Sequence, residues 1–298
     1  MKKNRFNDSL ALSIKRKKLI SSKHFFLRLL SNPDMFLQSI LCLFLSKFNL
    51  YIPLKTYTFW GIKMNIILPE VVSSEIRRYG YIEDSVASFI INFCKSKDQV
   101  IDVGSHFGFF ALLMSEIVGE KGSVHCFEPT PSSFSILKKN VIKKSNIITN
   151  ENAVMDQNID IELNDFGLAS SAFNSINNTR QNKNLINQKS IQKKILVKAI
   201  ILDDYVIENN LRPSLIKIDA ESSEYEVLKG MDFILNKLSP VLCIELGDLG
   251  IKGVLPSRKI IDFLIEKYGY KPYEIRNSKL NPHKLKEKYN YINLFFKK

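Results

Sequence analysis

From about residue 83 onward, short apolar runs alternate with longer stretches that have helical spacing. Residues 83–94, EDSVASFIINFC, predict a helix, and residues 98–105, DQVIDVGS, predict a buried strand. The next helix is expected over 109–120 and should end near Gly119 and Gly122, where glycine suits a C-terminal cap. This alternation is typical of βαβ units and therefore predicts a parallel sheet.

The same pattern continues with a second strand over 123–129, SVHCFEP, and a third over 146–154. Between them, Thr130 offers an N-cap hydroxyl and Pro131 a preset first-turn φ, so a helix is expected to begin there. Its predicted buried residues are Phe134, Leu137 and Val141.

The second half of the chain is less regular. A hairpin-like stretch is predicted from 159–165 through 167–173, and the polar segment 174–194 is expected to be an exposed loop. The further ordered segments are 195–206, a strand and helix over 214–230, a fifth core strand over 240–246, a helix over 257–268, and a final antiparallel pair at one sheet edge formed by 271–277 and 289–298.

These elements predict an α/β fold with helices on both faces of the sheet. With 298 residues and 45% apolar content, the chain can bury a full-sized core. We expect one large domain over 61–298, preceded by an N-terminal extension over 1–60. The four cysteines form no C-x-x-C pair and have no metal-type spacing, so they are interpreted as buried, reduced thiols of a cytosolic protein.

The positive charge is concentrated at the N-terminus. Residues 1–30 carry nine Lys or Arg against one acid, Asp8, which is +8 of the net charge of +13. A duplex-binding domain should instead carry its basic surface on the folded body, so nucleic acid is disfavoured as a partner. An anionic surface that meets the tail is the preferred interpretation.

The apolar segment 35–46, MFLQSILCLFLS, follows this tail and is too short to span a bilayer. It also lacks the small-residue cleavage site of a signal peptide. Two interpretations remain open: a helix packed on the main domain, which we prefer, or an interfacial anchor whose neighbouring Lys15, Arg16, Lys17 and Lys18 meet anionic lipid. In the second case residues 1–50 would hold a cytoplasmic protein at the inner face of a membrane.

A glycine turn follows the first strand, where ligands bind in open parallel sheets. Asp102, Gly104 and Gly108 are spaced D-x-G-x-x-x-G, which differs from the G-x-G-x-x-G of a pyrophosphate site. Gly104 would turn tightly against a ligand, Gly108 would let the helix close onto the sheet, and Asp102 would offer a carboxylate to a cationic or hydroxyl-bearing group. Glu128, at the end of the second strand, can accept hydrogen bonds from both hydroxyls of a ribose. A ribose and an amino acid without phosphates describe S-adenosylmethionine.

Five blocks of this chain resemble the FkbM family of S-adenosylmethionine-dependent methyltransferases, in the family's order: VIDVGSHFGFF, VHCFEPTPSSFSILKKNV, VKAIILDDYV, LIKIDAESSEYEVLKG and VLCIEL. The resemblance implies a Rossmann-like seven-stranded sheet and O-methyl transfer, often to sugars of glycans, glycolipids or natural products. We also assign Ser105 and Ala153 to the cofactor site, and Ser170 and Ser171 resemble a block near the active site. The family usually has Asn where this chain has His106, and Gly where it has Ser222.

A sugar hydroxyl is a weak nucleophile, so a positioned base should assist methyl transfer. Asp219 is the predicted base or hydroxyl acceptor, and Glu245 is expected to position the substrate. Glu221 could equally hold the turn through backbone N–H groups, and Glu224 is interpreted as a solvated acid on a helix face. A divalent metal held by Asp219, Glu245 and Asp248 is a weaker alternative, because spacing does not support it.

Three functions compete. A glycan-modifying O-methyltransferase is favoured over a catalytically inactive binding module at a membrane, because a decayed site should lose buried charges that reduce stability. A nucleic-acid methyltransferase is disfavoured because neither an N-P-P-Y motif nor a catalytic Pro-Cys is present. The sequence predicts neither the acceptor nor the oligomeric state.

Overall fold

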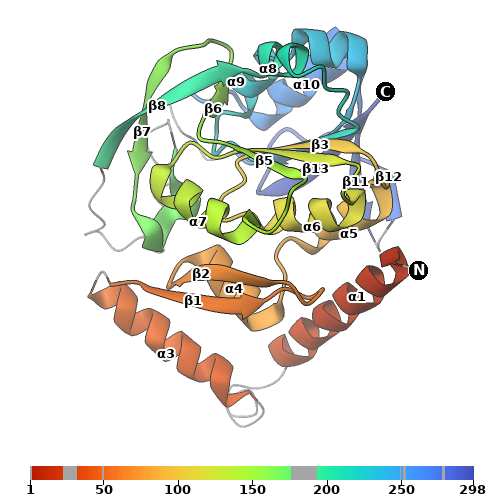
Figure 1. The fold of residues 1–298 in the computed structure, drawn as a ribbon. Coiled ribbons are helices and arrows are strands. Elements are labelled where there is room, and N and C mark those ends of the chain that lie inside the picture. Colours follow the sequence, from red (N-terminus) through yellow and green to blue (C-terminus); the bar gives the residue numbers. More distant parts are fainter. Residues whose placement is uncertain are drawn as a thin grey trace.

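The computed structural model describes residues 2–22, 32–48, 50–175, 193–248, 250, 253–276 and 279–298. Its centre is an eight-stranded sheet (Figure 1). In spatial order the strands are β12 (Lys279–Pro282), β11 (Lys271–Arg276), β13 (Ile292–Lys297), β10 (Val241–Leu246), β9 (Leu215–Ile218), β3 (Gln99–Val103), β4 (Ser123–Phe127) and β5 (Ile147–Asn150).

The sheet is parallel from β5 to β10, as the alternating pattern predicts. The last two predicted strands are antiparallel to each other, but β13 is inserted between β10 and β11 and so does not lie at the edge. The edge is formed by β12, which pairs with β11 and which the sequence pattern does not predict. Its four residues, KLNP, contain one apolar aliphatic side chain and give no strand pattern.

Helices cover both faces of the sheet, as predicted. Alternate strand residues supply the two cores: Val100 and Val124 belong to one, and Ile101 and Phe127 to the other. The first core is completed by α5 (Asp84–Phe93), α6 (Phe109–Val118) and α7 (Pro131–Val141), and the second by α8 (Leu202–Glu208), α9 (Glu224–Lys229), η2 (Ile234–Leu238) and α10 (Ser257–Tyr268).

Two local expectations around α7 need correction. Thr130 occupies the N-cap position, but its hydroxyl makes no capping bond and instead accepts a hydrogen bond from Asn174. The predicted third strand is divided at Glu151 and Asn152, because its second half, β6 (Ala153–Met155), leaves β4 and pairs with β8 (Lys193–Ile201) in another sheet.

That second sheet has the order β6-β8-β7 and replaces the predicted hairpin. The strand β7 (Asp160–Asp165) pairs with β8, which returns from far along the chain, while residues Leu168–Phe173 form the 3₁₀ helix η1. A partner this distant in sequence leaves no local signal. The predicted loop 174–194 lies outside the described residues except at its ends, where Lys193 and Lys194 belong to β8.

The N-terminal part comprises α1 (Lys2–Ser21), α3 (Pro33–Lys47), the hairpin β1 (Ile52–Tyr57) and β2 (Lys63–Leu68), and α4 (Val71–Tyr79). In Figure 1 these elements lie below the central sheet, on the side of α5 and α6. The domain boundary predicted at residue 60 falls within the β1–β2 turn. Phe6 and Leu45 share the core of the main domain, and none of the described helices is long and apolar enough to cross a membrane.

All four cysteines are free thiols. Cys94, Cys126 and Cys243 are buried, as expected, whereas Cys42 on α3 is only half-buried. This partial exposure places one flank of α3 at the protein surface.

Candidate active site

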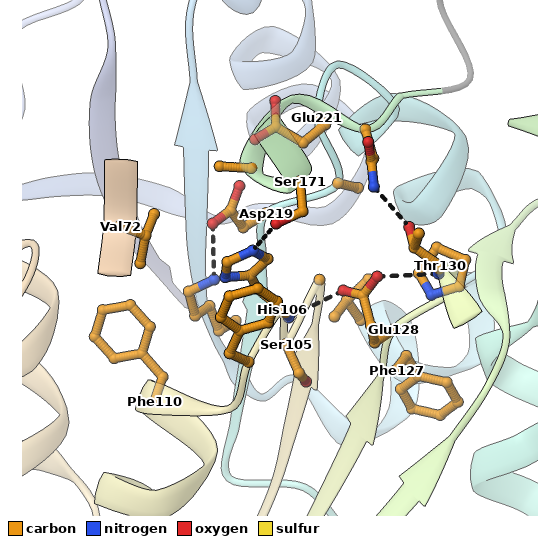
Figure 2. Close-up of a pocket in the computed structure, with 18 of the residues that line it drawn as sticks. Val72, Ser105, His106, Phe110, Phe127, Glu128, Thr130, Ser171, Asp219 and Glu221 are labelled. Atoms are coloured by element: carbon orange, nitrogen blue, oxygen red, sulfur yellow. Dashed lines mark hydrogen bonds and ion pairs between the residues drawn. The ribbon is translucent and has the colours of Figure 1, made fainter. Parts of the chain in front are cut away.

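A cavity lies at the carboxyl ends of the parallel strands and contains about 1020 Å³ of empty space, including space open to solvent. The β3–α6 turn and the ends of β4 and β9 line one part of it, and β2, α4 and η1 line another (Figure 2). Ligand sites of open parallel sheets are found at this edge. The lining includes Met64, Val72, Ile76, Glu83, Gly104, Ser105, His106, Glu128, Ala153, Ser171, Lys217, Asp219 and Glu221.

Both glycines of the turn permit close packing, and for Gly108 the neighbour differs from the one predicted. Gly104 has φ +77°, and a Cβ there would lie 1.8 Å from the backbone oxygen of Asp219, so glycine permits the close approach of two strand ends. Gly108 does not line the cavity. A Cβ on it would lie 2.6 Å from Leu137, so this glycine lets α6 approach α7 instead of the sheet.

Glu128 is buried at the end of β4 and lines the cavity. Its Oε2 accepts a hydrogen bond from the backbone N–H of His106, and its Oε1 accepts one from that of Thr130, both at 3.0 Å. Burial raises its pKa to about 7, and the two N–H groups oppose this shift. Because a carboxylate has about four acceptor positions, Glu128 still has acceptor capacity for a ligand in the cavity.

Asp102 lies behind the cavity and not in its lining, contrary to the prediction that it meets a ligand. It is 1% exposed, its Oδ1 is 3.8 Å from the ammonium of Lys217, and neither oxygen has a hydrogen-bond partner among the described residues. Burial raises the pKa of Asp102. We interpret Asp102 as a buried counter-ion of Lys217.

Lys217 connects Asp102 to the cavity and was missed by the sequence analysis. Its Nζ lies 3.0 Å from Oδ2 of Asp219, and the side chain is 2% exposed. Burial alone would lower its pKa, but Asp219, Asp102 and Glu83 together raise it above the ordinary value. The available signal was a lysine inside the buried run LIKI of β9, since buried lysines are almost always paired.

Glu83 is a second missed residue at this edge of the cavity. It precedes α5 with φ 43°, and its Oε2 accepts a hydrogen bond from Asn293 at 2.9 Å. Burial raises the pKa of Glu83 to about 7, and Lys217 opposes that shift. The buried ammonium is therefore surrounded by three carboxyl groups, of which Asp219 and Glu83 line the cavity.

Three acids converge at the ends of β9 and β10. One carboxylate oxygen each from Asp219, Glu221 and Glu245 lies within 4.8 Å of the others. The cavity lining includes Asp219 and Glu221 but not Glu245. Asp248 is not part of this cluster, because its oxygens accept N–H groups of Ser257 and Tyr289. The metal alternative with Asp248 therefore has the wrong third ligand.

The turn after β9 is held by Glu224, which contradicts its interpretation as a solvated acid. Glu224 is buried, and its Oε1 accepts the backbone N–H groups of Ala220 and Ser222. Glu221 and Ser222 have φ values of 49° and 77°, the left-handed region that favours glycine. Ser222 thus adopts the conformation expected of the family's usual glycine.

His106 occupies the centre of the cavity lining in Figure 2. Its Nε2 lies 2.8 Å from the hydroxyl of Ser171 on η1, and burial lowers its pKa. A neutral imidazole at this position can donate or accept one hydrogen bond. Ser171 lines the cavity, whereas Ser170, predicted with it, does not.

This mainly parallel sheet, in which β13 and β12 are reversed, its glycine turn and the buried acid at the end of β4 define a Rossmann-like methyltransferase domain. The chain belongs to the FkbM methyltransferases, since the family described as "Methyltransferase FkbM domain" matches residues 102–272. The N-terminal elements that complete the cavity lie outside this match.

Two curated relatives are also methyltransferases. The chain is 28% identical to the hexuronic acid methyltransferase AglP of Haloferax volcanii over 54% of its length and 61% of that protein. It is 23% identical to Methyltransferase 1 of Beauveria bassiana over 59% of its length and 77% of that protein. Among solved structures, methyltransferase FkbM from Methylobacillus flagellatus is similar with a TM-score of 0.45 and 14% identity, covering 75% of this chain and 52% of the other.

Proposed function

We propose that this protein is an S-adenosylmethionine-dependent O-methyltransferase that acts on a sugar hydroxyl of a glycan, glycolipid or natural product. The observation that carries the proposal is that Glu128 and Asp219 line one cavity from different strands. The carboxylate of Glu128 retains acceptor capacity for ribose hydroxyls, so the residues at this position fit S-adenosylmethionine. When bound, S-adenosylmethionine supplies an electrophilic methyl group.

Different residues of the chain would then bind the cofactor and activate the acceptor. Gly104, Ser105, Glu128 and Ala153 would hold the cofactor. Asp219 would accept the hydrogen bond, and then the proton, of the acceptor hydroxyl. The ammonium of Lys217 at 3.0 Å favours the ionised form of Asp219, which a base must have before it reacts. Glu245, which does not line the cavity, would affect the position of the acceptor only through Asp219 and Glu221.

The relative from Haloferax volcanii supports a sugar acid as the first acceptor to test. The experiment incubates the protein with S-adenosylmethionine that carries a labelled methyl group, and with either a hexuronic-acid glycan or its neutral hexose counterpart. We expect the label to appear in the hexuronic-acid glycan, as a methyl ether that is stable to base. Label in neither glycan, together with S-adenosylmethionine binding, would reject this acceptor class.

The retained buried charges of Asp102 and Lys217 disfavour the alternative of an inactive binding module.

Cofactor binding should depend on pH through Glu128. Because burial raises the pKa of Glu128 to about 7, the carboxyl group is mostly protonated at pH 6 and loses acceptor capacity for the ribose hydroxyls. Raising the pH from about 6 to about 8 should therefore tighten S-adenosylmethionine binding by up to about tenfold. Calorimetry across this range measures the effect. Glu128→Gln should bind more weakly with a flat profile, and a flat wild-type profile would contradict the assignment.

A further inference from the structure

The helix α3 presents an apolar face to solvent. Leu37, Ile40, Phe44 and Phe48 recur at intervals of three and four residues and so lie on one face of the helix. Leu37 is 62% exposed and Phe44 is 54% exposed, and the neighbouring Leu43 reaches 71%. Isolated exposed apolar residues are ordinary, but a contiguous row of them marks an interaction surface.

The opposite face of α3 is fixed to the protein in part by polar contacts. Gln38 is buried and donates a hydrogen bond to the backbone oxygen of Ser74 at 3.1 Å. Ser39 accepts one from the guanidinium of Arg78 at 3.0 Å. The inner face also carries Leu45, which is buried in the core, and Leu41, which packs against it. The helix therefore has apolar side chains on its outer face as well as on its inner one, whereas a surface helix of a soluble domain usually has a polar outer face.

Exposed basic residues are found on the C-terminal half of α1 and at the C-terminal end of α3, and Asp34 is an exposed acid at the N-terminal end of α3. Lys15, Arg16 and Lys18 are exposed on α1, which lies with α3 on the lower side of the molecule in Figure 1. On α3 itself, Lys47 is exposed beside Phe48, with its ammonium 5.8 Å from the centre of that ring. Aromatic and aliphatic side chains flanked by basic ones are characteristic of segments that lie in a lipid headgroup region.

We propose that the exposed face of α3, with Lys47 and the basic residues of α1, binds the surface of an anionic membrane. A second copy of this chain is a poorer occupant, because its own exposed lysines and arginine would meet those of the first. The helix lies in the interface, with its apolar row among the headgroups and acyl chains. Val72 and Ile76 of α4 line the cavity, and α3 contacts α4 through the hydrogen bond of Gln38. Only α4 therefore separates the membrane-binding helix from the proposed active site.

Vesicle cosedimentation with the full chain tests this proposal without any need for methyl transfer. We expect binding to phosphatidylcholine vesicles that contain about 30% phosphatidylglycerol, and weaker binding to phosphatidylcholine alone. Raising the salt from about 50 mM to about 500 mM should release most of the protein from the anionic vesicles. Leu43→Ser combined with Phe44→Ser should lower the partition coefficient by roughly tenfold or more.

The matched control is Ile142→Ser combined with Leu196→Ser, which removes two side chains of 79% and 69% exposure elsewhere on the surface. This variant should bind vesicles like the wild type. Equal loss in both variants, or no vesicle binding by the wild type, would overturn the proposal. Light scattering tests self-association as the competing explanation. If the wild type is a dimer that does not bind vesicles, and the variant with Leu43→Ser and Phe44→Ser is a monomer, the exposed face of α3 is a dimer interface.

Discussion

Asp219→Asn should lower the rate of methyl transfer by roughly 10²- to 10⁴-fold, the usual contribution of a positioned acid or base. Asn keeps the size and one acceptor oxygen of Asp219 but cannot take the proton of an acceptor hydroxyl. The side chain lines the cavity and is 21% exposed, and Lys217 keeps Asp102 as a partner, so the fold should persist. Single-turnover transfer of a labelled methyl group measures the effect.

The melting temperature and the affinity for S-adenosylmethionine are the controls for this variant. Both should remain close to the wild-type values if Asp219 acts on the acceptor. Activity that falls only in step with thermal stability would give Asp219 a structural role. Normal activity would show that Asp219 is not the base, and Glu221, the other acid of the cluster that lines the cavity, would then be the next residue to test.

Lys217→Met should destabilise the protein by roughly 3–5 kcal/mol, the usual effect of removing one partner of a buried ion pair. Methionine fills a similar volume, so the loss is chiefly electrostatic. Asp102 is 1% exposed and would lose its cation, and Asp219 would lose its closest one. Urea unfolding at pH 7.5 or thereabouts measures the free energy of unfolding.

A double variant separates charge from packing. Adding Asp102→Asn to Lys217→Met removes the uncompensated buried charge and should restore part of the lost free energy of unfolding. In the single variant the raised pKa of Asp102 means that the deficit should shrink as the pH falls and this carboxyl group becomes protonated. A loss below about 1 kcal/mol at neutral pH would show that the ion pair contributes little.

Periodicity predicted the central part of the fold because its strands and helices are local. The run VIDV and the apolar spacing of α5 and α6 carry their own burial pattern, and the structure has those elements within a few residues of the expected bounds. The errors fall where the partner is distant or the segment is short. The strand β7 pairs with β8 across the segment 176–192, and β12 has only four residues.

The candidate site, like the fold, was predictable from the sequence only in part. A motif can place Gly104 and Glu128 at strand ends, and the structure puts both in the cavity lining. The motif cannot show that Asp102 lies outside the cavity lining and beside Lys217, because this depends on which residue of β9 pairs with Asp102. Glu83 and α4 are brought to the cavity by tertiary packing, and no local pattern marks them.

The central claim is that the cavity binds S-adenosylmethionine with Glu128 at the ribose, and calorimetric titration tests it most directly. The wild type should bind one equivalent, and Glu128→Ala should weaken binding at least about tenfold, which is about 1.4 kcal/mol. Glu151→Ala, which removes an exposed acid just beyond β5, is the matched control and should bind normally. Tight binding of NAD with none of S-adenosylmethionine, or equal affinities for the wild type and Glu128→Ala, would contradict the account.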